Sequence, residues 1–114
     1  MLNGEPIRGT DGTIAMYRRD RTPGEWRGNV HVGSATSGAS LSAQEAEVLA
    51  EIGPVLQRWG IVFAGVDLIG GKLLEVNAFC PGGVALVRRH VGLDVRPLIW
   101  EALEAAAASR GGLL

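Results

Sequence analysis

The chain has 114 residues, a net charge of −1 and a pI of about 6.1. Its length suits one domain, residues 1–114, with a modest core, and its interleaved acidic and basic residues give no basis for a nucleic-acid partner. No stretch approaches the roughly 18 to 20 apolar residues of a transmembrane helix, and no signal pattern opens the sequence, so we expect a cytoplasmic protein with no membrane partner. The single cysteine, Cys80, excludes an internal disulfide.

The first part of the chain predicts one strand and one long loop. Residues 13–18 are typical of a strand that follows a glycine-containing turn at 9–12. With the short piece around Pro6 and Ile7, we expect this strand to complete an antiparallel sheet with a hairpin further along the chain. Residues 18–38 are rich in glycine, arginine and serine and have too few periodic apolar residues for a packed element, so we expect a mobile glycine-rich loop there.

A helix is predicted over residues 42–59. Ser42 and Glu45 have the spacing of a capping box, in which each side chain accepts from the other residue's backbone amide. Apolar residues then recur at helical spacing, and Gly60 supplies the left-handed residue that ends such a helix.

The next segment predicts a β-hairpin with an acidic face. Residues 61–69 form a buried strand, a glycine-rich turn follows, and residues 73–77 form the returning strand. A two-residue turn would pair Asp67 with Leu74, whereas a three-residue loop with a glycine bulge pairs Asp67 with Glu75. The second register is favoured because it collects one wholly apolar face, made of Val62, Ala64, Val66, Leu68, Leu74 and Val76.

Two more helices are predicted, a short one over residues 84–91 and a last one over 94–110. We expect the helices at 42–59 and 94–110 to cover the apolar face of the sheet. The expected fold class is therefore α+β, with an antiparallel sheet covered on one face by helices and the opposite face left open.

The open face carries Asp67, Glu75 and Asn77. Two carboxylates on one surface repel each other unless a cation lies between them, and magnesium prefers carboxylate and carbonyl oxygens as ligands. The alternative is an ordinary solvated face of a half-buried sheet, and the spacing alone does not separate the two.

The chain resembles the carboxyl-terminal part of prokaryotic glutathione synthetase. The resemblance is carried by residues 60–77 with the following Pro81, by the glycine-containing stretch 24–33 and by residues 52–56, in that family's order. It implies one half of an ATP-grasp fold, whose members hold ATP between two α+β halves. It also implies ATP and magnesium, or manganese in its place, as cofactors, with Asp67, Glu75 and Asn77 as the metal ligands.

The resemblance extends to the glycine-rich loop. It implies catalytic roles for Arg19 and Arg27, which would neutralise charge on a transferred phosphoryl group. It also implies cofactor binding by Asn29 and Gly33, together with Asn77. Without the resemblance, the arginines would read as a solvated cluster on a flexible loop.

The activity implied by the resemblance is that of a carboxylate–amine ligase. Magnesium–ATP would activate a carboxylate as an acyl phosphate, and an amine would then attack it to form an amide. In the family the small-molecule substrates are γ-glutamylcysteine and glycine.

Lys72 is the only lysine and lies in the hairpin turn, so the nucleotide-gripping lysines of the family have no counterpart. We therefore expect a homo-oligomer or a partner chain that supplies the missing half. Two alternatives stay open: a non-catalytic remnant or subunit that binds a partner chain, and an ATP-grasp ligase with a different peptide substrate.

Overall fold

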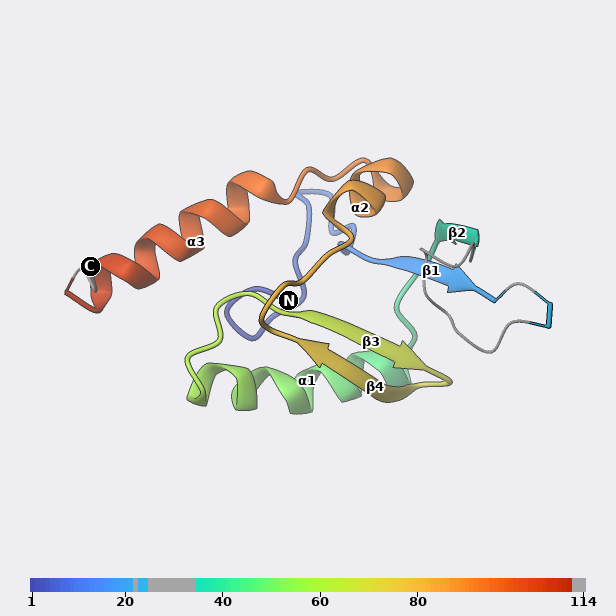
Figure 1. Cartoon of the computed structure of the whole chain (residues 1–114), viewed down its shortest axis with the longest axis horizontal. Coiled ribbons are helices and arrows are strands. Elements are labelled where there is room, and N and C mark those ends of the chain that lie inside the picture. Colours follow the sequence, from blue (N-terminus) through green and yellow to red (C-terminus); the bar gives the residue numbers. More distant parts are fainter. Residues whose placement is uncertain (22, 25–34, 112–114) are drawn as a thin grey trace.

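The computed structural model describes residues 1–21, 23–24 and 35–111 (Figure 1). Within these ranges the chain is of mixed α+β class, as predicted, with three helices and two small antiparallel sheets. The elements in chain order are β1 (Tyr17–Asp20), β2 (Ala35–Gly38), α1 (Ala43–Arg58), β3 (Gly65–Ile69), β4 (Lys72–Asn77), α2 (Val84–Val91) and α3 (Arg96–Ser109).

The strands divide between two sheets, which corrects the single sheet expected from the sequence. β1 pairs with β2, and β3 pairs with β4. Residues 13–16, expected in the strand, fold back on the preceding residues instead: Arg8 bridges to Ile14, and the Ala15 amide donates to the Ile7 carbonyl at 2.8 Å. The stretch expected to be a loop, 18–38, has paired strands at both of its ends.

The opening residues extend the β3–β4 sheet. Leu2 bridges to Phe63, and the Asn3 amide donates to the Val62 carbonyl at 2.7 Å. The Ala64 amide donates to the Met1 carbonyl at 3.1 Å. Ala64 is 1% exposed, so the opening residues pair with a buried part of the chain.

Helix α1 lies along the hairpin of β3 and β4 (Figure 1). Its predicted capping box is confirmed: the Ser42 hydroxyl accepts from the Glu45 amide at 3.2 Å, and Glu45 Oε2 accepts from the Ser42 amide at 2.8 Å. Its end is a Schellman motif, because Gly60, with φ of 69°, donates to Gln57 while Ile61 donates to Leu56. Both helix ends are thus satisfied by local residues.

Helix α1 also approaches the opening turn closely. A Cβ atom at Gly53 would overlap the carbonyl oxygen of Gly4, so only glycine fits this crossing. The Gln57 side chain adds a hydrogen bond of 2.8 Å to the Asn3 carbonyl. Leu49 and Leu56, at 7% and 3% exposure, are buried on the same helix.

Helix α2 packs on the β1–β2 sheet, and its bounds are those predicted. His90 Nε2 lies 2.9 Å from Thr36 Oγ1 on β2, and the Tyr17 ring of β1 lies directly against Gly83. The core of this half is formed by Ile7, Val87 and Val95, with side chains from the opening segment and from both neighbouring helices.

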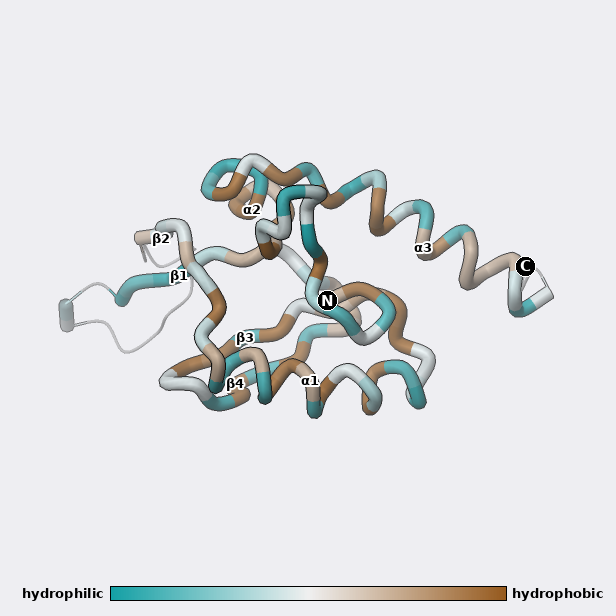
Figure 2. The backbone as a smooth tube through the Cα atoms, turned by 180° about the vertical axis from the view of Figure 1, so that it is seen from behind, coloured by the Kyte–Doolittle hydropathy of each residue, from teal (hydrophilic) through white to brown (hydrophobic). Residues whose placement is uncertain are grey.

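Helix α3 does not cover the sheet, so that expectation was wrong. It extends beyond the sheets, beside the opening segment, and has no buried residue (Figure 1). Its first turn contacts the core through Ile99, and beyond its end Arg110 donates to the Gly60 carbonyl at 3.2 Å. Apolar and polar residues alternate along its length (Figure 2), and Trp100 is 66% exposed.

None of the helices in the described ranges is long and apolar enough to span a bilayer.

Candidate functional site

The β3–β4 hairpin brings the predicted acidic residues together. Asp67 lies directly opposite Glu75, and Gly65 lies opposite Asn77. Cross-strand partners point to the same face of a sheet, and so do residues two apart on one strand. The pairing of Asp67 with Glu75 predicted from the hydrophobic pattern is therefore confirmed, and Asn77 shares their face.

The turn that produces this register differs from the predicted one. Ile69 pairs with Lys72 across a two-residue turn, Gly70–Gly71, rather than across a three-residue loop. Both glycines have positive φ, 56° and 71°, as the favoured tight hairpin turn requires.

The extra residue is accommodated inside β4, as a bulge. Leu68 pairs with Leu73 and Asp67 pairs with Glu75, so Leu74 has no partner on β3. Leu74 is 61% exposed, which removes it from the predicted buried apolar face. The acids therefore end on one face because of the bulge.

Arg19 joins this face from the other sheet. Its Nη2 lies 2.5 Å from Asp67 Oδ2, and the two side chains are 30% and 40% exposed. The contact spans 48 positions in the sequence. It places next to each other two residues that the sequence indicated separately, one as a phosphoryl-binding group and one as a metal ligand.

Asn77 is held by a local turn. Its Oδ1 accepts from the Cys80 amide at 3.0 Å. The chain then passes over Gly65, where an added Cβ would lie 3.5 Å from the Pro81 side chain. An amide oxygen has two lone pairs, so this bond fixes the Asn77 carbonyl while leaving one position for a further partner.

Three predicted residues, Arg27, Asn29 and Gly33, lie outside the described residues. Their expected roles stay predictions. The strands on either side of them are described: Asp20 of β1 pairs with Ala35 of β2. The stretch between these strands therefore leaves and re-enters the sheet at one place, next to Arg19.

The face formed by Asp67, Glu75 and Asn77 suits a hard cation. It offers two carboxylates and an amide oxygen, the ligand types that magnesium prefers. Within the described ranges no three or more His, Cys, Asp or Glu side chains gather into a metal-binding group. A cation here would thus depend on the amide oxygen and on ligands from outside the hairpin, as magnesium commonly does when it binds with phosphates.

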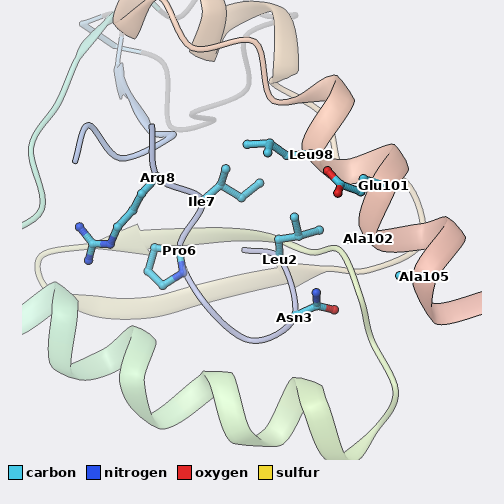
Figure 3. Close-up of a pocket in the computed structure, with 9 residues that line it drawn as sticks. All are labelled: Leu2, Asn3, Pro6, Ile7, Arg8, Leu98, Glu101, Ala102 and Ala105. Carbon is cyan, nitrogen blue, oxygen red and sulfur yellow. The ribbon is translucent and has the colours of Figure 1, made fainter. Parts of the chain in front are cut away.

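Two pockets lie elsewhere, beside α3. Figure 3 shows one of them, bordered by the opening segment and α3, with Leu2, Ile7 and Leu98 along it. None of the predicted site residues that the structure describes lines it or the neighbouring pocket near Gly60. The described site residues therefore lie on the open hairpin face and outside these two pockets.

Residues 1–92 match the family model described as prokaryotic glutathione synthetase, ATP-grasp domain. The chain belongs to this family. It is 37% identical over 106 residues to a glutathione synthetase of Agrobacterium fabrum, an alignment that covers 91% of this chain and 30% of that protein. Glutathione synthetases of Rhodopseudomonas palustris (38% over 91 residues; 78% and 29%) and Anaplasma centrale (33% over 110 residues; 96% and 34%) are also similar.

The chain spans about a third of the length of these curated glutathione synthetases. The match to the glutathione synthetase family model includes all seven predicted site residues. It ends before α3, so the helix that extends from the fold lies outside the matched region.

Proposed function

We propose that this chain is the magnesium- and ATP-binding portion of a glutathione synthetase-like carboxylate–amine ligase. The observation that supports this most is the hairpin register, which sets Asp67 opposite Glu75 with Asn77 on the same face, in a chain of this family. Magnesium–ATP, when bound, supplies the phosphoryl group that activates a carboxylate for attack by an amine. In the family the two substrates are γ-glutamylcysteine and glycine.

The residues of the hairpin hold the cation. Glu75 and Asn77 would hold the cation that accompanies the nucleotide phosphates, and Asp67 would support a second ion or a bridging contact. The Cys80 amide keeps the Asn77 oxygen oriented, since it donates to the same atom at 3.0 Å.

The arginines act on the transferred group. Arg19 and Arg27 neutralise the negative charge that develops on the phosphoryl oxygens, which their planar forks of donors match. Asn29 and Gly33 bind the nucleotide. Reaction then depends on positioning and on charge, with no protein nucleophile.

A partner completes the site. Exposed apolar residues on α3 and on the hairpin support this part of the proposal, because exposed apolar patches often mark a surface that contacts other protein. They are Ile69, Leu73, Leu74, Leu98, Trp100 and Leu103. The occupant is the remainder of the ligase, on the same or another chain, or a second copy of this chain. A role as a non-catalytic subunit would use the same surface.

The test is calorimetric titration of the purified chain with ATP, with and without magnesium. We expect binding that requires magnesium and that weakens at least about tenfold in the double variant Glu75→Ala with Asn77→Ala, because both proposed ligands are lost. The control is Glu104→Ala, which removes an exposed carboxylate of α3 outside the matched region.

Equal binding by the double variant would overturn the assignment of these ligands. Absence of binding by the unmodified chain would overturn independent nucleotide binding and favour the subunit role.

A further inference from the structure

The ion pair between Arg19 and Asp67 ties the two sheets of the molecule together. Arg19 lies on β1 and Asp67 on β3, and the two strands belong to separate sheets. The other β1 arginine, Arg18, turns to its own strand, where its Nε donates to Asp20 at 2.8 Å. Arg19 is therefore the arginine of β1 that reaches the acidic hairpin.

The strand that carries Arg19 is anchored on its other side. Arg19 pairs with Thr36 across the β1–β2 sheet, and Thr36 bonds His90 of α2. The β1–β2 sheet is thus joined to α2 through packing and a histidine, and to β3 through the ion pair. The second attachment uses the same carboxylate that the proposed function assigns to a cation.

We propose that Arg19 and a divalent cation compete for Asp67, so that cation binding on the hairpin face detaches β1 from β3. The inference rests on the proposed metal site. The guanidinium lies in direct contact with Asp67 Oδ2, so a cation that binds this oxygen would lie next to the positive guanidinium and repel it. Even a cation on the other carboxylate oxygen would lie close enough to repel the guanidinium strongly.

The competition sets an order of events. Arg19 becomes free to contact phosphoryl oxygens only after a cation has taken over the charge of Asp67. Binding free energies are linked. The Arg19–Asp67 contact therefore weakens cation binding by the same factor by which cation binding weakens the contact. The strands β1 and β2 lie at the two ends of the glycine-rich stretch. Metal binding therefore detaches the β1–β2 sheet from β3 before a substrate binds.

The test compares affinity for Mn²⁺ alone, measured by calorimetry and by electron paramagnetic resonance, in three forms of the full chain. These are the unmodified protein, Arg19→Gln and Arg18→Gln. We expect Arg19→Gln to bind Mn²⁺ about three- to fivefold more tightly, the factor that corresponds to a half-exposed ion pair. Arg18→Gln removes the same charge from the same strand without touching Asp67, so we expect its affinity to stay close to that of the unmodified protein.

Equal binding by Arg19→Gln would overturn the competition. Weaker binding would overturn it too, and would show that the arginine supports the metal site instead. Equal tightening in both variants would overturn it too, because that result needs only the loss of a positive charge. Absence of Mn²⁺ binding in all three proteins would overturn the proposed metal site, a result distinct from the other two.

Amide hydrogen exchange of the unmodified protein gives a second measurement that needs no variant to fold. We expect Mn²⁺ to increase exchange in β1 and β2 while slowing it in β3 and β4. Unchanged or slower exchange in β1 on Mn²⁺ binding would contradict detachment of the strand.

Discussion

Helices α1 and α3 have similar lengths, 16 and 14 residues, but very different surroundings. Helix α1 buries Leu49, Gly53 and Leu56, whereas α3 buries none of its residues. Apolar residues recur in both helices. The difference shows that apolar periodicity predicts a helix but does not identify what the helix packs against.

The ends of the two helices differ in the same way. Helix α1 starts at a complete capping box and ends in a glycine motif. Helix α3 follows the N-cap residue Val95, whose side chain makes no capping hydrogen bond, beside a local ion pair between Asp94 and Arg96. A helix that is apolar on several sides is usually covered by further protein, which agrees with the proposal that a partner contacts α3.

The largest expected effect is a difference in the free energy of unfolding between variants of α1 and α3. Leu56→Ala removes a side chain that is 3% exposed, so we expect it to lower the free energy of unfolding by about 2–4 kcal/mol. Leu103→Ala, at a site 42% exposed, should lower it by less than about 1 kcal/mol. Urea unfolding of both variants measures the difference. Similar losses would mean that α3 is covered in solution, and the loss at Leu103 would then depend on protein concentration.

A second variant tests the close crossing of α1 over the opening turn. Alanine normally favours a helix over glycine by roughly 1 kcal/mol, but at Gly53 its Cβ would overlap the Gly4 carbonyl. We therefore expect Gly53→Ala to destabilise the chain by about 1–3 kcal/mol in the same unfolding experiment. The control is Gly82→Ala, because an added Cβ there meets no atom within 4 Å. Stabilisation by Gly53→Ala would show that the crossing is looser than described.

The smallest effect concerns the start of α3. Hydrogen bonds from Arg96 lower the pKa of Asp94 to about 2. Because the folded pKa lies below the ordinary value of 3.8, the contribution of this pair is complete only well above pH 3.8 and is lost as the pH falls through about 2. We expect a carboxyl NMR titration of Asp94 to have its midpoint near 2 and to move upward in Arg96→Ala. An unchanged midpoint would show that the Asp94–Arg96 ion pair does not lower the pKa of Asp94.

Local features of the fold were predictable from the sequence. The capping box at Ser42, the glycine end at Gly60 and the bounds of α2 follow from residues close together in the chain. The pairing of Asp67 with Glu75 was also predictable, because the alternation of apolar residues restricts which faces can be buried.

Features that join distant segments were not predictable in this way. The bulge at Leu74 and the three-residue loop give the same pairing of acids, so the apolar pattern cannot tell them apart. The division into two sheets depends on β1 pairing with β2 across the stretch between them. The spacing of residues in the sequence does not predict the contact of Arg19 with Asp67, because that contact depends on how the two sheets are placed relative to each other.

The bulge in β4 also decides which changes of length the hairpin can accept. Pairing is regular on both sides of Leu74, so a chain without this residue could keep the Asp67–Glu75 and Gly65–Asn77 pairs in an unbulged ladder. Loss of a residue between Glu75 and Asn77 would instead turn Asn77 to the opposite face, because side chains alternate along a strand. Leu74 is therefore the position in β4 where a deletion is compatible with the acidic face, and the two residues after Glu75 are a segment whose length must stay fixed.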